Sequence, residues 1–330
     1  MADLGQVQIV TVGDLEKSLG SKKFINYIKE CEDGFKRQVS EVSDYVLRNR
    51  EVNLVLLSGP TSSGKTTFST HFTRSLTAAG RRTHLISMDD YYKLTEPEYD
   101  DQGRPDYESI NTLDMDLLYR DLQKLQAGKE VHIPTFDFKS RSRLYEPHKR
   151  IRPQPGDAFM LEGLHGLSSD LTCHIDNSRA VKTFIMPYAK LVSDSSILDK
   201  TDMRVLRRLS RDVFRRGATA ISTIDFWPMI ARAEAKFIPE YLEAADFYVN
   251  SALAYEYCVI VPKARDQIKM SLQLYEDGQL PPSNTVKPGV YYADLDRALK
   301  MARRLLDACN EVPRVSPSLV PEDSILQEFI

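Results

Sequence analysis

Residues 59–66 spell G-P-T-S-S-G-K-T, which matches the pattern G-x-x-x-x-G-K-[ST] at every fixed position. Glycines let backbone amides turn inward around phosphate oxygens, where side chains would block the approach. Lys65 would reach the β- and γ-phosphates of a nucleotide, and the hydroxyl of Thr66 would bind Mg²⁺. The loop predicts a nucleotide site made of Gly59, Thr61, Ser62, Ser63, Gly64, Lys65 and Thr66, with Thr67 placed for a further phosphate contact.

The sequence around this loop has the pattern that such a motif needs. Residues 53–58 form a short apolar run, and the residues from Lys65 to about Ala79 have the pattern of a helix. A helix after the loop offers free N–H groups and a positive dipole end to an anion. A chance glycine turn is the alternative, and the strand–loop–helix context makes nucleotide binding the preferred interpretation.

Acidic residues end two other apolar runs. "LISMDDYY" places Asp89 and Asp90 at a strand end, and "FMLEG" places Glu162 at another. Ligands of parallel sheets bind beyond the carboxyl ends of the strands. A phosphoryl-transfer site needs an acid near Mg²⁺ and gains from a carboxylate that accepts the proton of the acceptor hydroxyl. Asp89 and Glu162 could divide these roles, although loop ends are often acidic only because they are solvated.

Six arginines lie close together at positions 204, 207, 208, 211, 215 and 216. At 100° per residue, all but Arg216 fall within a band of about 100° on a helix. Like charges at this spacing repel, and Asp202 and Asp212 are expected not to neutralise the face. The pattern predicts a lid whose arginines stabilise charge on a transferred phosphoryl group, with Gly217 as its bend. The alternative is a solvated helix face.

Short apolar runs alternate with helical patterns along most of the chain. This alternation predicts an α/β fold in which helices cover both faces of a mainly parallel sheet. Strands are expected at 53–59, 81–90, 157–167 and 180–187 and at "DFYVNS" (246–251) and "EYCVIVP" (256–262), and "KEVHIPTFDF" (129–138) is expected to be a strand that enters a functional loop. Helices are expected at 14–50, 65–79, 114–128, 201–245 and 294–309.

The composition is that of an ordinary globular protein: of 330 residues, 42% are hydrophobic and 28% charged. A net charge of -3 argues against non-specific nucleic-acid binding. The four cysteines are scattered without a CxxC pair, which suits a reducing compartment. The N-terminus lacks the pattern of a signal peptide, and no apolar run approaches the roughly 20 residues of a membrane span. We expect a cytoplasmic protein without a nucleic acid or a membrane as partner.

Seven segments, in this order, resemble the phosphoribulokinase/uridine kinase family, and most closely its bacterial-type nucleoside kinase branch. They are "GPTSSGKTT", "SMDDYY", "RPDYES", "PTFDFKSRSR", "LEGLHGL", "DMRVLRRLSRDVFRRG" and "EAADFYVNSA", and the resemblance covers most of residues 53–265. The ending "PEDSILQEFI" also resembles that branch. Some members carry a threonyl-tRNA synthetase-like domain before the kinase, which we expect this chain to lack.

The resemblance implies a P-loop NTPase fold of three layers, α/β/α, and ATP- and Mg²⁺-dependent phosphorylation of the 5′-hydroxyl of a nucleoside, above all uridine. It makes Asp89 the general base, Glu162 the acid near Mg²⁺ and Asp106 the ligand of the ribose hydroxyls. Tyr92, Phe136, Phe138 and Arg141 would line the nucleoside pocket. Arg204, Arg207, Arg208, Arg211 and Arg216 would be the lid arginines, the first three acting on the transferred group and the last two on ATP.

Two positions depart from the family pattern. Eukaryotic uridine–cytidine kinases have tyrosine where Phe136 stands and histidine where Arg141 stands, and both help to recognise the base. Phe136 can stack but cannot hydrogen-bond, while Arg141 only donates and always carries charge. We therefore expect base recognition to be altered while phosphoryl transfer is retained.

The expected organisation is a helical extension at 1–50, a P-loop nucleoside kinase domain at 51–275 with an arginine lid around 200–220, and a C-terminal loop and helix at 276–330. Relatives often form oligomers, and the two helical extensions could serve a homo-oligomer. One alternative is a kinase of a sugar phosphate or a pantothenate-like alcohol. A regulatory nucleotide-binding protein is another, although a switch GTPase would need an N-K-x-D signature, which the sequence lacks.

Overall fold

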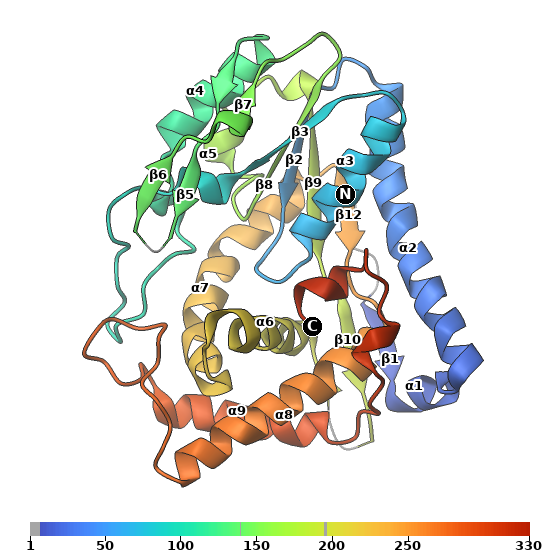
Figure 1. Ribbon diagram of the computed structural model, residues 1–330, viewed down its shortest axis with the longest axis vertical. Helices are drawn as coiled ribbons and strands as arrows, with labels where there is room; N and C mark the ends of the chain where they lie inside the picture. Colours follow the sequence, from blue (N-terminus) through green and yellow to red (C-terminus); the bar gives the residue numbers. More distant parts are fainter. Residues whose placement is uncertain (1–6, 139, 195–196) are drawn as a thin grey trace.

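A parallel sheet of five strands forms the centre of the computed structural model, which describes residues 7–138, 140–194 and 197–330 (Figure 1). The first six residues of the predicted N-terminal extension and Lys139 of "PTFDFKSRSR" lie outside the described residues. The order is β12-β9-β2-β8-β3, and each neighbouring pair is parallel. The strands are β2 (Leu54–Ser58), β3 (Thr83–Ser87), β8 (Ala158–Gly163), β9 (Ala180–Met186) and β12 (Phe247–Asn250). The predicted α/β class is confirmed.

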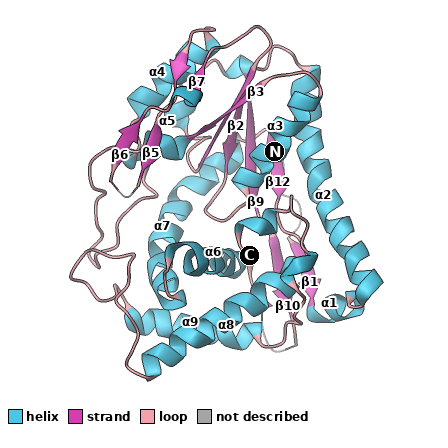
Figure 2. Ribbon diagram, in the orientation of Figure 1, coloured by secondary structure: helices cyan, strands magenta, loops and turns pink. Residues whose placement is uncertain are grey.

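Helices cover both faces of this sheet (Figure 2). The helices of the described residues are α1 (Val12–Ser18), α2 (Ser21–Arg48), α3 (Lys65–Ala78), α4 (Met115–Gln126), α5 (Ser169–Thr172), α6 (Lys200–Arg216), α7 (Ala220–Ala244), α8 (Glu256–Glu276) and α9 (Leu295–Cys309). A second sheet joins β1 (Gln8–Thr11), β10 (Ala189–Val192) and β11 (Ile197–Leu198). Two small antiparallel pairs complete the described strands: β4 (Val131–His132) with β7 (Arg150–Ile151), and β5 (Thr135–Asp137) with β6 (Ser142–Leu144).

Strand β2 shows why the apolar run before the loop is continuous. Val55 and Leu57 enter one core, together with side chains of α2, α3, α6 and α8. Leu54 and Leu56 enter a second core on the opposite face, with side chains of α4 and α5. Because both faces are covered, every side chain of the strand is buried, and no polar residue alternates with the apolar ones.

One predicted strand is wrong. "EYCVIVP" lies inside α8, and all seven of its residues are buried. A short run that is apolar on every side has the same pattern in a buried helix as in a buried strand, so periodicity does not separate them. Helix α8 packs against α6, α7 and α9, which explains why it has no polar side in this stretch.

Glycine and proline divide two other predicted elements. The helix expected at 201–245 is α6 followed by α7, because Gly217 adopts a left-handed conformation (φ 63°) that ends α6, and the Thr219 side chain caps α7. The strand expected at 129–138 consists of β4 and β5, separated by Ile133 and Pro134. Within the described ranges, no helix is long and apolar enough to cross a bilayer.

Candidate active site

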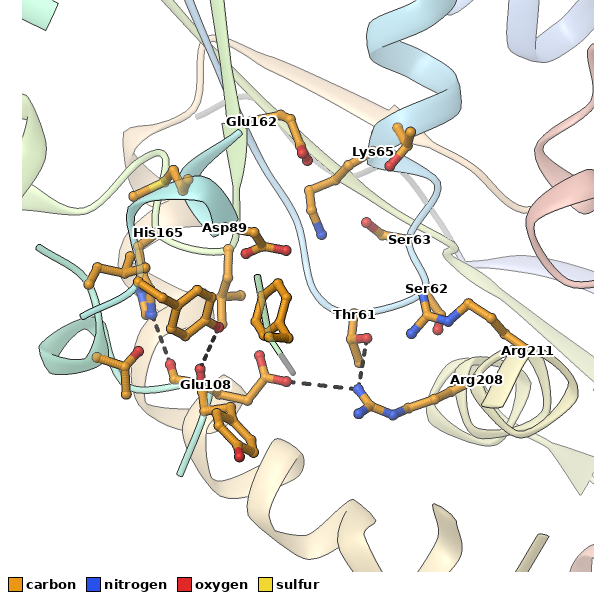
Figure 3. A pocket seen from close by; sticks show the side chains of 18 of the residues that line it. Thr61, Ser62, Ser63, Lys65, Asp89, Glu108, Glu162, His165, Arg208 and Arg211 are labelled. Atoms are coloured by element: carbon orange, nitrogen blue, oxygen red, sulfur yellow. Dashed lines mark hydrogen bonds and ion pairs between the residues drawn. The ribbon is translucent and has the colours of Figure 1, made fainter. Parts of the chain in front are cut away.

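A cavity of about 680 Å³ lies at the carboxyl ends of β2, β3 and β8 (Figure 3). Every motif that the sequence singled out before residue 220 contributes to its wall. The lining includes Thr61, Ser62, Ser63, Gly64, Lys65, Thr66, Asp89, Tyr92, Glu108, Phe138, Arg141, Glu162, His165, Arg208, Arg211, Arg216 and Glu328. The topology therefore brings the phosphate loop, the two strand-end acids and three lid arginines to one place.

The phosphate loop joins β2 to α3 and has the backbone that its sequence predicts. Ser62 and Gly64 adopt positive φ values of 59° and 87°, which turn the loop amides inward. At Gly59 a Cβ atom would lie 2.2 Å from the Ile185 carbonyl oxygen, so no side chain fits there. The Lys65 ammonium folds back and donates to the Gly59 and Pro60 carbonyls at 2.9 and 3.1 Å.

Two serine hydroxyls of this loop are available to a ligand. The Oγ atoms of Ser62 and Ser63 are buried at the cavity wall and have no hydrogen-bond partner among the described residues. A buried hydroxyl without a partner is costly, and phosphate oxygens would satisfy both. The loop therefore fits an anionic ligand with several oxygens.

The two strand-end acids face the same space as Lys65. Asp89 lies in the 3-10 turn η1 (Met88–Tyr91) directly after β3, and Glu162 lies in β8, paired with Ser87 of β3 and Leu57 of β2. The Ser87 hydroxyl donates to the Glu162 carboxylate at 2.7 Å. Figure 3 shows the Lys65 ammonium and the Asp89 carboxylate pointing toward one another across the cavity.

Burial raises the pKa of both carboxyl groups. The Asp89 side chain is open to water inside the cavity, but the surrounding protein desolvates it and raises its pKa, while the charge of Lys65 opposes the shift. Burial likewise raises the pKa of Glu162, again opposed by Lys65. A carboxylate with a raised pKa is a better proton acceptor, which suits Asp89 to act as a general base.

Aromatic residues form the wall opposite the phosphate loop. The Tyr92 ring lies 5.6 Å from that of Phe136 and 5.3 Å from that of Phe138. Phe138 lines the cavity, whereas Phe136 is buried behind it. The Arg141 guanidinium lies 5.9 Å from the centre of the Phe136 ring and pairs with Glu96 at 3.4 Å. Of the three residues of "PTFDFKSRSR" predicted to contact a base, Phe138 and Arg141 line the cavity and Phe136 does not.

The carboxylate of "RPDYES" that lines the main cavity is Glu108, not Asp106. Asp106, predicted to hold the ribose hydroxyls, lines a separate cavity of about 270 Å³ together with Arg232. Glu108 belongs to the same motif and lines the main cavity, where Arg208 approaches it at 3.8 Å. Burial raises the pKa of Glu108, and the charge of Arg208 opposes this.

His165 holds the backbone at Glu108. Its Nε2 lies 2.8 Å from the Glu108 carbonyl oxygen, and its Nδ1 lies 2.6 Å from the Tyr241 hydroxyl. Burial lowers the pKa of His165 to about 4, so the ring is neutral at pH 7. Because a carbonyl only accepts, Nε2 carries the proton and Nδ1 accepts from Tyr241. His165 thus positions the Glu108 backbone, and no pattern in the sequence indicated this contact.

The five predicted lid arginines of α6 separate into two groups. Arg208, Arg211 and Arg216 line the cavity, and Arg208 donates to the Thr61 hydroxyl at 2.9 Å. Arg204 and Arg207 lie outside its lining.

Arg204 and Arg207 instead hold the outer side of the phosphate loop. Arg204 pairs with Glu234 of α7 and donates to the Thr61 carbonyl. Arg207 is fully buried, pairs with Glu256 of α8 at 2.6 Å and donates to the Ser62 carbonyl. The face predicted to be unbalanced is therefore neutralised in part by carboxylates of other helices.

More than half of the chain matches one known protein family. A model described as the Phosphoribulokinase / Uridine kinase family matches residues 54–254. The chain belongs to this family. A uridine kinase of Staphylococcus epidermidis is 27% identical to this kinase over 201 residues, covering 60% of this chain and 87% of that one. A uridine kinase of Staphylococcus aureus is 28% identical over 184 residues, covering 56% and 79%.

Among solved structures, a possible uridine kinase of Bacillus stearothermophilus covers 64% of this chain and 97% of its own, with 15% identity and a TM-score of 0.42. This kinase is a phosphotransferase with an alcohol acceptor, and the family implies ATP as donor.

The donor atoms in this kinase's cavity suit the Mg²⁺ that the family usually uses. No group of three His, Cys, Asp or Glu side chains within the described ranges forms a complete metal site. Mg²⁺ needs none, because it takes one or two protein oxygens and completes its octahedron with phosphate oxygens and waters. The Thr66 hydroxyl and the Glu162 carboxylate, both lining the cavity, supply oxygens of the right kind.

Two further predicted phosphate contacts lie outside the cavity lining, Gly59 and Thr67. Gly59 is needed because its backbone passes so close to Ile185 of β9 that no side chain fits. Thr67 is bonded to Glu328, a residue of the C-terminal end that the sequence analysis did not connect with the site. No local signal could have found Glu328, because it lies 261 positions from its partner.

Proposed function

We propose that this kinase transfers the γ-phosphoryl group of ATP to the 5′-hydroxyl of a nucleoside, with uridine as the first candidate. The observation that supports it most is one continuous cavity with a phosphate loop at one end, an aromatic wall with a carboxylate at the other, and Asp89 between them. This arrangement is suited to hold a triphosphate and an alcohol in line.

At the phosphate end, Lys65 releases the loop carbonyls and turns to the β- and γ-phosphates. Arg208, Arg211 and Arg216 add positive charge from α6, where the transferred group develops charge. Thr66 and Glu162 would hold Mg²⁺, which neutralises negative charge on the β- and γ-phosphates. Arg204 and Arg207 support the loop through the Thr61 and Ser62 carbonyls and are assigned no contact with phosphate.

At the acceptor end, Asp89 accepts the proton of the attacking hydroxyl. The two oxygens of Glu108 can accept hydrogen bonds from neighbouring ribose hydroxyls. We therefore assign ribose binding to Glu108 and not to Asp106. Tyr92, Tyr107 and Phe138 offer rings against which a flat base can pack. His165, kept neutral, holds the Glu108 backbone and takes no part in proton transfer.

A sugar phosphate is the second candidate acceptor. Arg141 lines the acceptor side, and its fixed positive charge would favour an acceptor that carries its own phosphate. Glu108 on the same side opposes this, because it would repel a second anion. Uncharged nucleosides therefore remain the preferred substrates.

A coupled assay of ADP release tests this proposal. Uridine, cytidine, a purine nucleoside and a sugar phosphate are compared at equal concentration with ATP and Mg²⁺. We expect turnover with nucleosides, and formation of the 5′-monophosphate confirmed by mass spectrometry. Turnover with the sugar phosphate alone, or with none of the four, would refute the proposal.

A further inference from the structure

The C-terminal end of the chain reaches the first turn of the phosphate-loop helix. Glu328 ends the short 3-10 helix η6 (Ile325–Glu328), and its Oε1 accepts from the Thr67 backbone N–H at 3.1 Å and from the Thr67 hydroxyl at 2.6 Å. The Glu328 side chain also lines the main cavity. A carboxylate therefore lies at the positive end of α3, where the loop has to receive phosphate.

The first-turn amides of α3 have no intrahelical partners, and Gly64 has no side chain to cap them. Glu328 takes one of these amides together with the hydroxyl beside it. An N–H and an O–H that converge on one oxygen are the donors a phosphate oxygen would use. The same two donors cannot serve a carboxylate and a phosphate at once, and the two anions repel each other.

The backbone on either side of Glu328 is firmly held. Ile325, Leu326 and Phe329 are fully buried, and Ile325 packs against Gly64 of the loop. The Arg207 guanidinium lies 5.2 Å from the centre of the Phe329 ring.

Polar contacts add to this hold. Arg215 donates to the Gln327 carbonyl at 3.1 Å, and Lys263 donates to that of Phe329. Releasing the segment would expose several large apolar side chains to water. A ligand at the loop is therefore expected to displace the Glu328 side chain and to leave the backbone in place.

We propose that Glu328 is an internal occupant of the phosphate site, which a nucleotide must displace from Thr67 when it binds. The inference rests on the proposed use of the loop for ATP but not on the identity of the acceptor. The C-terminal end thereby sets the affinity of the loop for nucleotides: it holds the donors of Thr67 in the free enzyme and lowers nucleotide affinity by competition. Glu328 is in this sense a residue that sets the nucleotide affinity of the donor site.

Glu328→Gln removes the charge while it keeps the size and one acceptor oxygen, so the fold is retained. We expect ADP and ATP, measured by titration calorimetry without any acceptor, to bind about tenfold more tightly, which is the lower end of the contribution of a hydrogen bond to a charged group. The free variant should melt at a slightly lower temperature, because the carboxylate no longer caps α3. Opposite signs for affinity and stability separate competition from a merely structural cap.

Glu322→Gln is the matched control, because it makes the same charge change on an exposed side chain of the same segment. It should bind nucleotides like the wild type. In a Thr67→Val background, Glu328→Gln should change affinity less, since one of the two shared donors, the Thr67 hydroxyl, is gone and only the backbone N–H is left.

Unchanged or weaker nucleotide binding in Glu328→Gln would overturn the inference, as would an equal gain in Glu322→Gln. The failure of the proposed function is distinguishable. A tenfold gain in ATP affinity without turnover of any nucleoside would support the role of Glu328 and refute the nucleoside acceptor. Uridine turnover with unchanged ATP affinity in Glu328→Gln would support the nucleoside acceptor and refute the role of Glu328.

Discussion

Replacement of Glu108 by glutamine tests which of the two carboxylates of "RPDYES", that of Glu108 or that of Asp106, binds the nucleoside. Glutamine has nearly the same shape and keeps one acceptor oxygen, but it lacks the charge. A hydrogen bond to a charged group contributes about 1.5–3 kcal/mol. If one such contribution to ribose binding is lost, kcat/KM for the nucleoside should fall by about 10- to 150-fold.

The donor side should respond differently to the same change. Arg208 lies 3.8 Å from the Glu108 carboxylate and 2.9 Å from the Thr61 hydroxyl of the phosphate loop. Without the charge of Glu108, the field of Arg208 toward phosphate is stronger, so the Kd of ATP should stay constant or decrease. We therefore expect Glu108→Gln to lower kcat/KM for the nucleoside without weakening the binding of ATP.

Asp106→Asn is the matched control, because Asp106 lies two residues away and lines a different cavity. Its kcat/KM should fall much less than that of Glu108→Gln, because the Asp106 carboxylate accepts from the backbone N–H groups of Glu108 and Ser109 and asparagine keeps an acceptor oxygen for them. Steady-state kinetics with varied nucleoside, together with calorimetric titration of ATP, gives both quantities. A larger loss in Asp106→Asn than in Glu108→Gln would refute the assignment, and so would an equal loss of ATP affinity in Glu108→Gln.

Burial and charge lead to further predictions for four residues of the site and its support. Burial raises the pKa of Asp89 above the ordinary aspartate value, and the base must be ionised, so kcat/KM should fall with decreasing pH through an inflection above about 4; a profile that is flat down to that pH would contradict this. Neutral His165, with its pKa of about 4, should add no inflection near pH 7. Arg207→Met should lower the free energy of unfolding by about 3–5 kcal/mol in urea denaturation, because Glu256 stays buried without its partner. Arg208→Met should lower turnover more than stability. If Arg207→Met were stable but inactive, the result would contradict its supporting role and favour the predicted contact of Arg207 with the transferred phosphoryl group.

The parts of the site that local sequence determines were predictable. The phosphate loop needs eight neighbouring residues, and its backbone follows from where the glycines stand. Asp89 and Glu162 were found because parallel strands end at one edge, and the register of β2, β8 and β3 places Glu162 between the other two strands. In both cases the residues that form the local sequence pattern are the same residues that form the site.

Features that depend on partners from distant elements were not predictable in this way. A helical wheel gives the direction of Arg204 and Arg207 but not the carboxylates of α7 and α8 that meet them. The position of "EYCVIVP" depends on the helices that surround it, since burial on all sides removes the periodicity. Two acids in one short motif could not be ranked until the loop was seen to turn Glu108, and not Asp106, toward the main cavity.

We propose that Asp89 takes the proton of a nucleoside hydroxyl held beside the phosphate loop. The most direct test is the kcat for uridine phosphorylation in Asp89→Asn, with ATP affinity measured on the same preparation. A lost general base should reduce kcat by about 10²- to 10⁴-fold while ATP binds at least as tightly, since a negative charge near Lys65 is removed. Turnover within a few-fold of the wild-type value would contradict the account.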